Sequence, residues 1–149
     1  MKILTKYHGE VEIEESQIIH FRQGLPGFLD KTEFTIVPFH EEGPFMIMQS
    51  IQTPALAFVM ISPFDFFEGY SVKLTDQLLE TLEIKEKEDI ALFVILTVKE
   101  PFEDTTANLQ GPIVINTKKK LGKQFILSDA SYKTKHYLTN QLTSSVKEG

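Results

Sequence analysis

Apolar and polar residues alternate with a period of two along most of the chain, which predicts short strands with one buried face. Turn-forming residues separate these stretches, as His8-Gly9 does between the first two. The predicted strands cover residues 2–7, 10–14, 17–21, 33–39, 44–50, 56–62, 71–74, 89–98, 108–116 and 123–128. We expect an antiparallel sheet that closes into a small barrel or a barrel-like sandwich, because closure removes exposed strand edges.

One stretch, residues 75–84, has a helical period instead. Leu78, Leu79 and Leu82 share one helical face, and Thr75 before them can cap the helix. The fold class is therefore mostly β with one short helix. We expect a single domain over residues 1–138, followed at 139–149 by a polar tail whose order the sequence leaves open.

The composition is that of one globular domain that can bury its own core, with 149 residues of which 42% are hydrophobic. The absence of cysteine excludes disulfides and thiolate metal sites. The apolar runs are too short for a membrane span, and the N-terminus becomes acidic where a signal peptide would stay apolar. We expect a cytoplasmic protein that does not contact membranes.

Charge is unevenly distributed along the chain, whose formal net charge is -6. Residues 1–98 contain 7 Lys or Arg and 16 Asp or Glu, whereas residues 99–149 contain 8 and 5. The first part would repel a phosphate backbone and favour a basic partner protein.

No group of residues has the spacing of a metal site. The histidines form no HxH or HxxxH motif; they are His8, His20, His40 and His136. Glu10, Glu12 and Glu14 fall on one predicted strand face, but i, i+2 neighbours lie about 7 Å apart, too far to chelate one ion without another element. An exposed acidic strand face is the better interpretation.

The sequence also lacks the marks of catalysis or of nucleotide binding. No nucleophile lies beside a base at a recognisable spacing. The segment GLPG does not match a phosphate-binding loop, and its Pro26 has no N–H to offer a phosphate. We predict no catalytic residue, no cofactor and no small-molecule substrate.

Two segments could bind a macromolecule. Lys118, Lys119 and Lys120 lie at the tip of a predicted hairpin, where they could serve as a soluble turn or as an RNA contact. RNA binding would require interleaved aromatic residues, and only Phe125 is near. We therefore expect no direct nucleic-acid binding, and a small β-barrel nucleic-acid-binding module is the alternative function.

The second segment is an aromatic loop between predicted strands. It contains Phe64, Phe66, Phe67 and Tyr70. A loop with this many aromatic residues either folds back on the core or meets a partner, and the sequence leaves both interpretations open.

Several motifs, in this order and at these distances, resemble the FliW family of bacterial flagellar assembly factors. They are Gln23-Gly24-x-Pro26-Gly27-Phe28, Pro63-Phe64, Ala107-Asn108-Leu109 with Gly111-Pro112-Ile113 and Asn116, and Gly122-Lys123-Gln124. The resemblance covers residues 1–138. Arg22 and Gly111 depart from it, since the family often has proline and alanine there.

The resemblance implies a barrel-like protein without enzymatic activity and with two protein partners. One is flagellin before export, and the other is CsrA, an RNA-binding regulator that represses translation of flagellin messenger RNA. Together with the charge count, it suggests that the acidic strand meets the regulator. The predicted partner contacts are Glu10, Glu12, Glu14, Phe64, Phe66, Phe67, Lys123 and Gln124.

Overall fold

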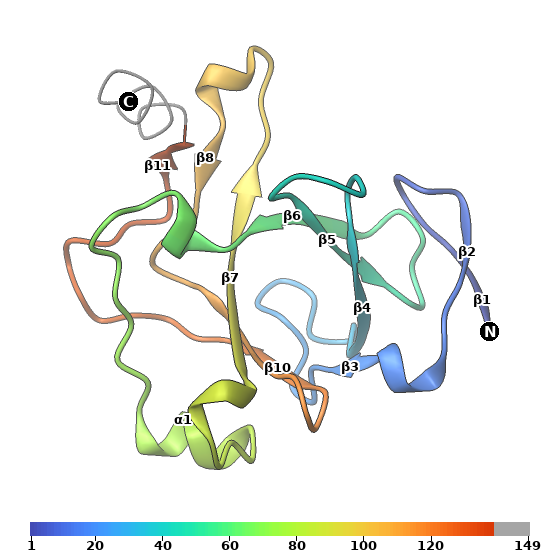
Figure 1. Ribbon diagram of the computed structural model, residues 1–149, viewed down its shortest axis with the longest axis horizontal. Coiled ribbons are helices and arrows are strands. Elements are labelled where there is room, and N and C mark those ends of the chain that lie inside the picture. Colours follow the sequence, from blue (N-terminus) through green and yellow to red (C-terminus); the bar gives the residue numbers. More distant parts are fainter. Residues whose placement is uncertain (139–149) are drawn as a thin grey trace.

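Seven strands of the computed structural model, which describes residues 1–138, close into a barrel (Figure 1). The predicted polar tail at 139–149 lies outside the described residues. The strands of the ring, in spatial order, are β7 (Ile90–Thr97), β6 (Ala57–Ile61), β5 (Met46–Ser50), β4 (Glu33–Pro38), β3 (Ile19–His20), β10 (Leu121–Gln124) and β9 (Ile113–Asn116). The prediction of a mostly β, closed barrel is confirmed.

The ring closes at β7, whose two halves pair with different neighbours. Residues 90–93 pair with β9, and Val94 and Ile95 pair with β6. At the other seam, β3 and β10 run parallel and pair through a single position, His20 opposite Leu121. Within the described residues the six other pairs of the ring are antiparallel, as predicted.

Four further strands of the described chain lie outside the ring. β1 (Lys2–Leu4) and β2 (Glu10–Glu12) form a separate hairpin at the right of Figure 1. β8 (Thr106–Ala107) pairs with the end of β7, and β11 (His136–Tyr137) pairs with β8. The short 3-10 helices are η1 (Glu15–Gln17), η2 (Pro63–Asp65), η3 (Lys87–Asp89) and η4 (Phe102–Asp104).

A bulge at residues 108–112 separates β8 from β9, although both pair with β7. Asn108 Oδ1 holds the bulge by accepting hydrogen bonds from the N–H groups of Gln110 (3.1 Å) and Gly111 (2.9 Å). The strand predicted from residue 108 therefore begins only at Ile113. The motif around Asn108 encodes a turn within a strand.

Alternate side chains of the strands build two core clusters, as a period of two requires. Phe21, Leu25, Phe34, Met48 and Met60 belong to the first cluster. The second cluster lies against the other face of the same strands, and the aromatic loop and the segment after β10 contribute to it. Its members include Ile47, Val59, Ile61, Phe67, Tyr70, Val94, Leu127 and Leu138.

The loop that follows β3 covers the first cluster and is fixed at both ends. Phe21 is fully buried, and the ring of Phe28 packs edge-on against Phe58 with centroids 5.8 Å apart. Gly24 has a φ of +68°, and a Cβ there would lie 2.4 Å from the carbonyl oxygen of Leu29. Only glycine fits this position.

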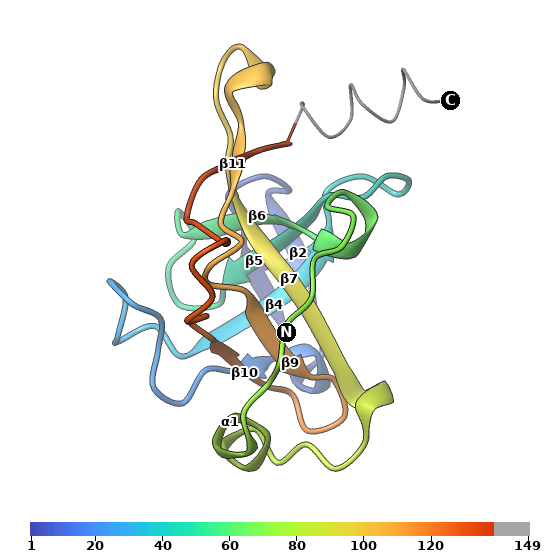
Figure 2. The ribbon, with the colours of Figure 1, turned by 90° about the vertical axis from the view of Figure 1, so that its left-hand side faces the viewer.

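Helix α1 (Asp76–Thr81) lies at the lower end of the barrel in Figures 1 and 2. Thr75 caps it, since its Oγ1 accepts a hydrogen bond from the N–H of Leu78 at 3.1 Å. Leu78 and Leu82 are each 3% exposed and pack against Val114 and Leu121. The predicted helix is confirmed and is shorter than its periodic pattern.

The strand predicted at residues 71–74 is wrong. This segment connects the aromatic loop to α1 in an extended form and joins no strand in the described part of the chain. Four residues with alternating side chains suit any extended segment, so the pattern alone does not require a sheet partner.

Candidate functional site

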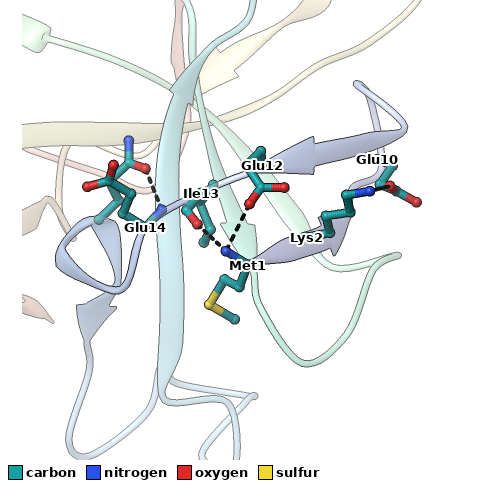
Figure 3. Close-up of polar contacts among 7 residues, drawn as sticks. Met1, Lys2, Glu10, Glu12, Ile13 and Glu14 are labelled. Carbon is teal, nitrogen blue, oxygen red and sulfur yellow. Dashed lines mark hydrogen bonds and ion pairs between the residues drawn. The ribbon is translucent and has the colours of Figure 1, made fainter.

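Glu10 and Glu12 of β2 are exposed on the hairpin, and each lies beside a positive charge at the N-terminal end of the chain, on Met1 or Lys2 (Figure 3). Glu10 Oε1 is 3.7 Å from Lys2 Nζ, and Glu12 Oε1 is 3.2 Å from the amino group of Met1. The two glutamate side chains are 57% and 66% exposed, so solvent screens both pairs. The hairpin thus presents carboxylates that its own first strand partly neutralises.

Glu14 lies beyond the end of β2 and leads into η1 (Figure 3). Its N–H donates to Gln17 Oε1 at 2.8 Å, and its side chain is exposed. Because the strand ends at Glu12, the predicted acidic strand face consists of Glu10 and Glu12, with Glu14 on the turn that follows.

The aromatic loop, residues 62–70, divides its rings between the core and the surface. Phe67 and Tyr70 are 7% and 6% exposed and belong to the second core cluster, and Phe66 packs half-buried against it. Phe64 is 54% exposed. Most of the loop therefore folds back on the core, and Phe64 is the ring that it presents to solvent.

Two titratable groups beneath this loop have shifted pKa values. Burial is the main cause that raises the pKa of Tyr70, and the neighbouring Tyr132 is the second cause. The hydroxyl of Tyr70 donates a hydrogen bond to the carbonyl of Leu109 at 2.7 Å. Burial and the charge of Lys133 lower the pKa of His136, whose Nε2 accepts the Lys133 N–H at 2.8 Å. Both shifts favour the neutral form of a side chain that holds the loop in place.

The lysine turn, residues 117–120, joins β9 to β10 and is held by Asn116, which is 2% exposed. Asn116 Oδ1 accepts from the N–H groups of Lys118 (3.0 Å) and Lys119 (3.1 Å). Its Nδ2 donates to the carbonyls of Leu82 and the next residue, at 2.8 and 3.1 Å. One buried side chain therefore shapes the turn and ties it to the C-terminus of α1.

The surroundings of the lysine turn favour the interpretation as a hairpin turn. Lys118 and Lys119 are exposed, but the nearby Phe125 is half-buried and packs against the core. Single-stranded RNA binding uses exposed aromatic faces beside the basic residues, and Phe125 does not provide one.

Lys123 and Gln124 follow the turn on β10 and have different surroundings. Gln124 Nε2 donates to the carbonyl of Gly111 at 2.9 Å and so ties β10 to the bulge. Lys123 lines a pocket of about 300 Å³ between β10, the loop after β3 and α1. Both side chains are half-buried, and Gln124 is held by the bulge whereas Lys123 faces the pocket.

This pocket lies beside the single pairing of β3 with β10, since His20 and Leu121 both line it. At Gly122 a Cβ would lie 2.6 Å from the ring of Phe21, so only glycine allows this approach. Arg22 Nη2 lies 2.9 Å from Glu83 Oε2 at the rim, in a largely exposed ion pair. The charged lining, which also contains His20, Glu80 and Lys123, suits polar groups of a partner.

The predicted contacts do not converge on one site. Figure 1 shows the β1–β2 hairpin and the aromatic loop on opposite sides of the barrel, with β10 below both. Sequence reasoning missed the pocket because Arg22 and Glu83, 61 residues apart, meet only in the folded chain. The departure of Arg22 from its expected residue was the one available signal.

Among residues 1–138, no group of three or more His, Asp or Glu side chains could hold a metal ion. No helix of the described chain is long and apolar enough to cross a membrane.

Comparison with known proteins gives one family. The model of the FliW protein family matches residues 2–138. The chain is 57% identical over 138 residues to the flagellar assembly factor FliW of Geobacillus kaustophilus. The alignment covers 93% of this chain and 95% of that protein. The chain is also 47% identical over 136 residues to the flagellar assembly factor FliW of Bacillus subtilis, with 91% and 95% covered.

A solved structure gives the same result. The crystal structure of a flagellar assembly factor FliW aligns with a TM-score of 0.87 at 54% identity and covers 93% of this chain and 96% of that chain. The barrel and its attached loops are therefore shared with that protein.

Proposed function

The chain belongs to the FliW family of flagellar assembly factors, and on that premise we propose that it acts without catalysis by binding two proteins in the cytoplasm. One partner is flagellin before export, and the other is the translational regulator CsrA. Flagellin stays bound to the chain until the flagellin itself is exported. The freed chain then binds CsrA and relieves repression of flagellin messenger RNA.

The observation that carries this proposal is the family match over residues 2–138, together with 57% identity to a curated flagellar assembly factor. The charge distribution supports the choice of a basic partner, because residues 1–98 contain 16 acidic and 7 basic side chains. A regulator that binds RNA must present basic surface, to which such a chain is attracted.

The exposed carboxylates of the β1–β2 hairpin suggest how the regulator is antagonised. A negatively charged protein docked beside an RNA-binding surface disfavours RNA by repulsion and need not cover the RNA site itself. Glu10, Glu12 and Glu14 are all exposed, and no described side chain buries them.

Isothermal titration calorimetry of the purified chain with CsrA tests the proposal, in the presence and absence of saturating flagellin. RNA competition is measured on the same samples. Binding that lowers the RNA affinity of CsrA and disappears with flagellin supports the partner exchange. The absence of heat with both folded partners would refute it.

Charge reversal of the hairpin should separate the two partners. We expect Glu10→Lys, Glu12→Lys and Glu14→Lys together to weaken CsrA antagonism more than flagellin binding. Lysines there would also face Lys2 and the amino group of Met1, so the corresponding glutamine triple serves as the variant with less repulsion.

The matched control for this experiment reverses three exposed carboxylates elsewhere, by Asp30→Lys, Glu86→Lys and Glu88→Lys. It changes the net charge equally and leaves the hairpin intact. Equal loss of both partners in the hairpin variants, with the fold retained by circular dichroism, would contradict the role of the hairpin.

A further inference from the structure

Three loops meet at the end of the barrel opposite α1, which is the upper end in Figure 1. They are the β1–β2 turn, the loop from β4 to β5, and the segment that follows β7. The aromatic rings of these loops pack against one another. The ring centroids of Tyr7 and Phe39 are 5.4 Å apart, and those of Phe45 and Phe102 are 6.2 Å apart. His8 Nε2 also lies 2.9 Å from the carbonyl oxygen of Phe39.

Between the β4–β5 loop and the segment that follows β7 is an apolar pocket of about 230 Å³, which we call the upper pocket. Its lining is Phe39, His40, Phe45, Val59, Val98 and Phe102. Val59 forms a floor that is 9% exposed, whereas Val98 and Phe102 are 51% and 40% exposed. Apolar side chains that gather around a depression mark an interaction surface more often than isolated exposed residues do.

The rim of the upper pocket is acidic. Glu41 and Glu42 follow His40 directly, and Glu100, Glu103 and Asp104 flank Phe102; all five are exposed. Two lysines are nearby as well: Lys99 follows Val98, and Lys6 precedes Tyr7, whose ring packs on Phe39. An apolar centre with an excess of negative charge around it complements a segment with the opposite pattern.

We propose that the upper pocket is the docking site for a basic amphipathic segment of a protein partner, with one large apolar side chain seated in the pocket against Phe45 and Phe102. The proposal rests on the proposed function, in which the basic partner is the RNA-binding regulator. The apolar contact with the regulator then lies at this end of the barrel. The hairpin glutamates lie on or directly after β2, the strand that follows the β1–β2 turn. The apolar side chain supplies affinity, and the rim steers the encounter.

The size of the pocket supports a side chain as its occupant. A volume of about 230 Å³ is below the roughly 300–1,000 Å³ of pockets that enclose whole small molecules. The described lining has one polar side chain, the exposed imidazole of His40, and no carboxylate, amine or guanidinium that would bind a polar metabolite.

The first arm of the test removes the apolar contact and measures affinity for purified CsrA and for purified flagellin by titration calorimetry. Phe102→Ala should weaken CsrA binding by roughly tenfold or more, as loss of a central interface residue does. Val98→Asn is a second variant in case Phe102→Ala unfolds. Leu29→Ala, which removes a 71% exposed side chain from another loop, should leave both affinities within about twofold.

The second arm tests the rim. Glu41→Lys with Glu42→Lys should slow association with CsrA and reduce its dependence on salt, because rim charges act mainly on the association rate. The control variant, Glu86→Lys with Glu88→Lys, changes the net charge by the same amount. Glu88 lies on η3, and Glu86 lies directly before it. Association is measured by stopped-flow fluorescence with labelled CsrA at two ionic strengths.

The two arms distinguish the docking site from the proposed function. If the wild-type chain binds CsrA and all pocket and rim variants bind it equally well, the docking proposal is wrong and the proposed function stands. Equal weakening of CsrA and flagellin by folded variants overturns the assignment of the pocket to the regulator. Failure of the wild-type chain to bind CsrA overturns both proposals.

Discussion

Replacing Asn116, the residue before the lysine turn, by alanine should destabilise the fold more than replacing any side chain within the turn. The side chain is 2% exposed and makes four hydrogen bonds between 2.8 and 3.1 Å, two as donor and two as acceptor. Each hydrogen bond contributes a net free energy of about 1 kcal/mol, and less where water can replace the lost partner. The four bonds together therefore give a loss of about 3 kcal/mol in the free energy of unfolding. For a domain of this size the melting temperature should fall by roughly 10 °C.

An Asn116→Asp variant shows which half of the network matters. The new carboxylate keeps the acceptor bonds to the N–H groups of Lys118 and Lys119 but brings a second oxygen toward the carbonyls at the end of α1. Two buried carbonyls then lose their donor and face a negative charge, so this variant should be at least as unstable as Asn116→Ala. Lys118→Ala, which leaves the backbone N–H in place, is the control and should change stability by less than about 0.5 kcal/mol.

Urea unfolding followed by circular dichroism measures these differences through the transition midpoint at constant slope. Asn116→Ala within about 1 kcal/mol of the wild-type chain would refute the reasoning, because the four bonds would then contribute nothing beyond what water supplies. A ranking in which Lys118→Ala is the least stable variant would refute it as well.

Two further predictions concern the aromatic loop. Phe67→Ala should cost about 3–5 kcal/mol in urea unfolding because the ring is buried, whereas Phe64→Ala at a 54% exposed position should cost less than about 1 kcal/mol; equal effects would contradict the division of the loop. The raised pKa of Tyr70 means that its neutral form stabilises the fold fully below the ordinary tyrosine value and that this stability is lost as the pH rises above it. In an alkaline absorbance titration, one of the four tyrosines should therefore ionise only as the chain unfolds, and four equal titrations in the folded state would refute this.

The sequence was a good guide where one pattern has one structural meaning. Strand alternation placed most strands of the ring, since a buried face requires a period of two. The Thr75 cap and the leucines after it placed α1. Conversely, the pattern at residues 108–116 hid a bulge, because Asn108 forms hydrogen bonds within its own turn that interrupt a strand without breaking its apolar alternation.

The candidate contacts were harder to predict because they depend on what lies next to each residue in space. Phe64 and Phe67 belong to the same aromatic loop, yet only the fold decides which ring is buried. Gln124 is a predicted contact, and the fold gives its side chain a structural hydrogen bond to the carbonyl of Gly111 as well. The upper pocket collects residues from distant loops, and neither Phe45 nor Phe102 has a local sequence signal that identifies its neighbour.

The parallel seam between β3 and β10 bears on how the chain is made. The ribosome delivers β3 early and its partner β10 near the end of the described chain, so the nascent protein holds β3 to β6 as an open sheet with two unpaired edges. Contacts of such long sequence separation form slowly, and open edges pair readily with other chains in the meantime. The interval between synthesis of β6 and of β10 is therefore the period in which this protein is most exposed to aggregation.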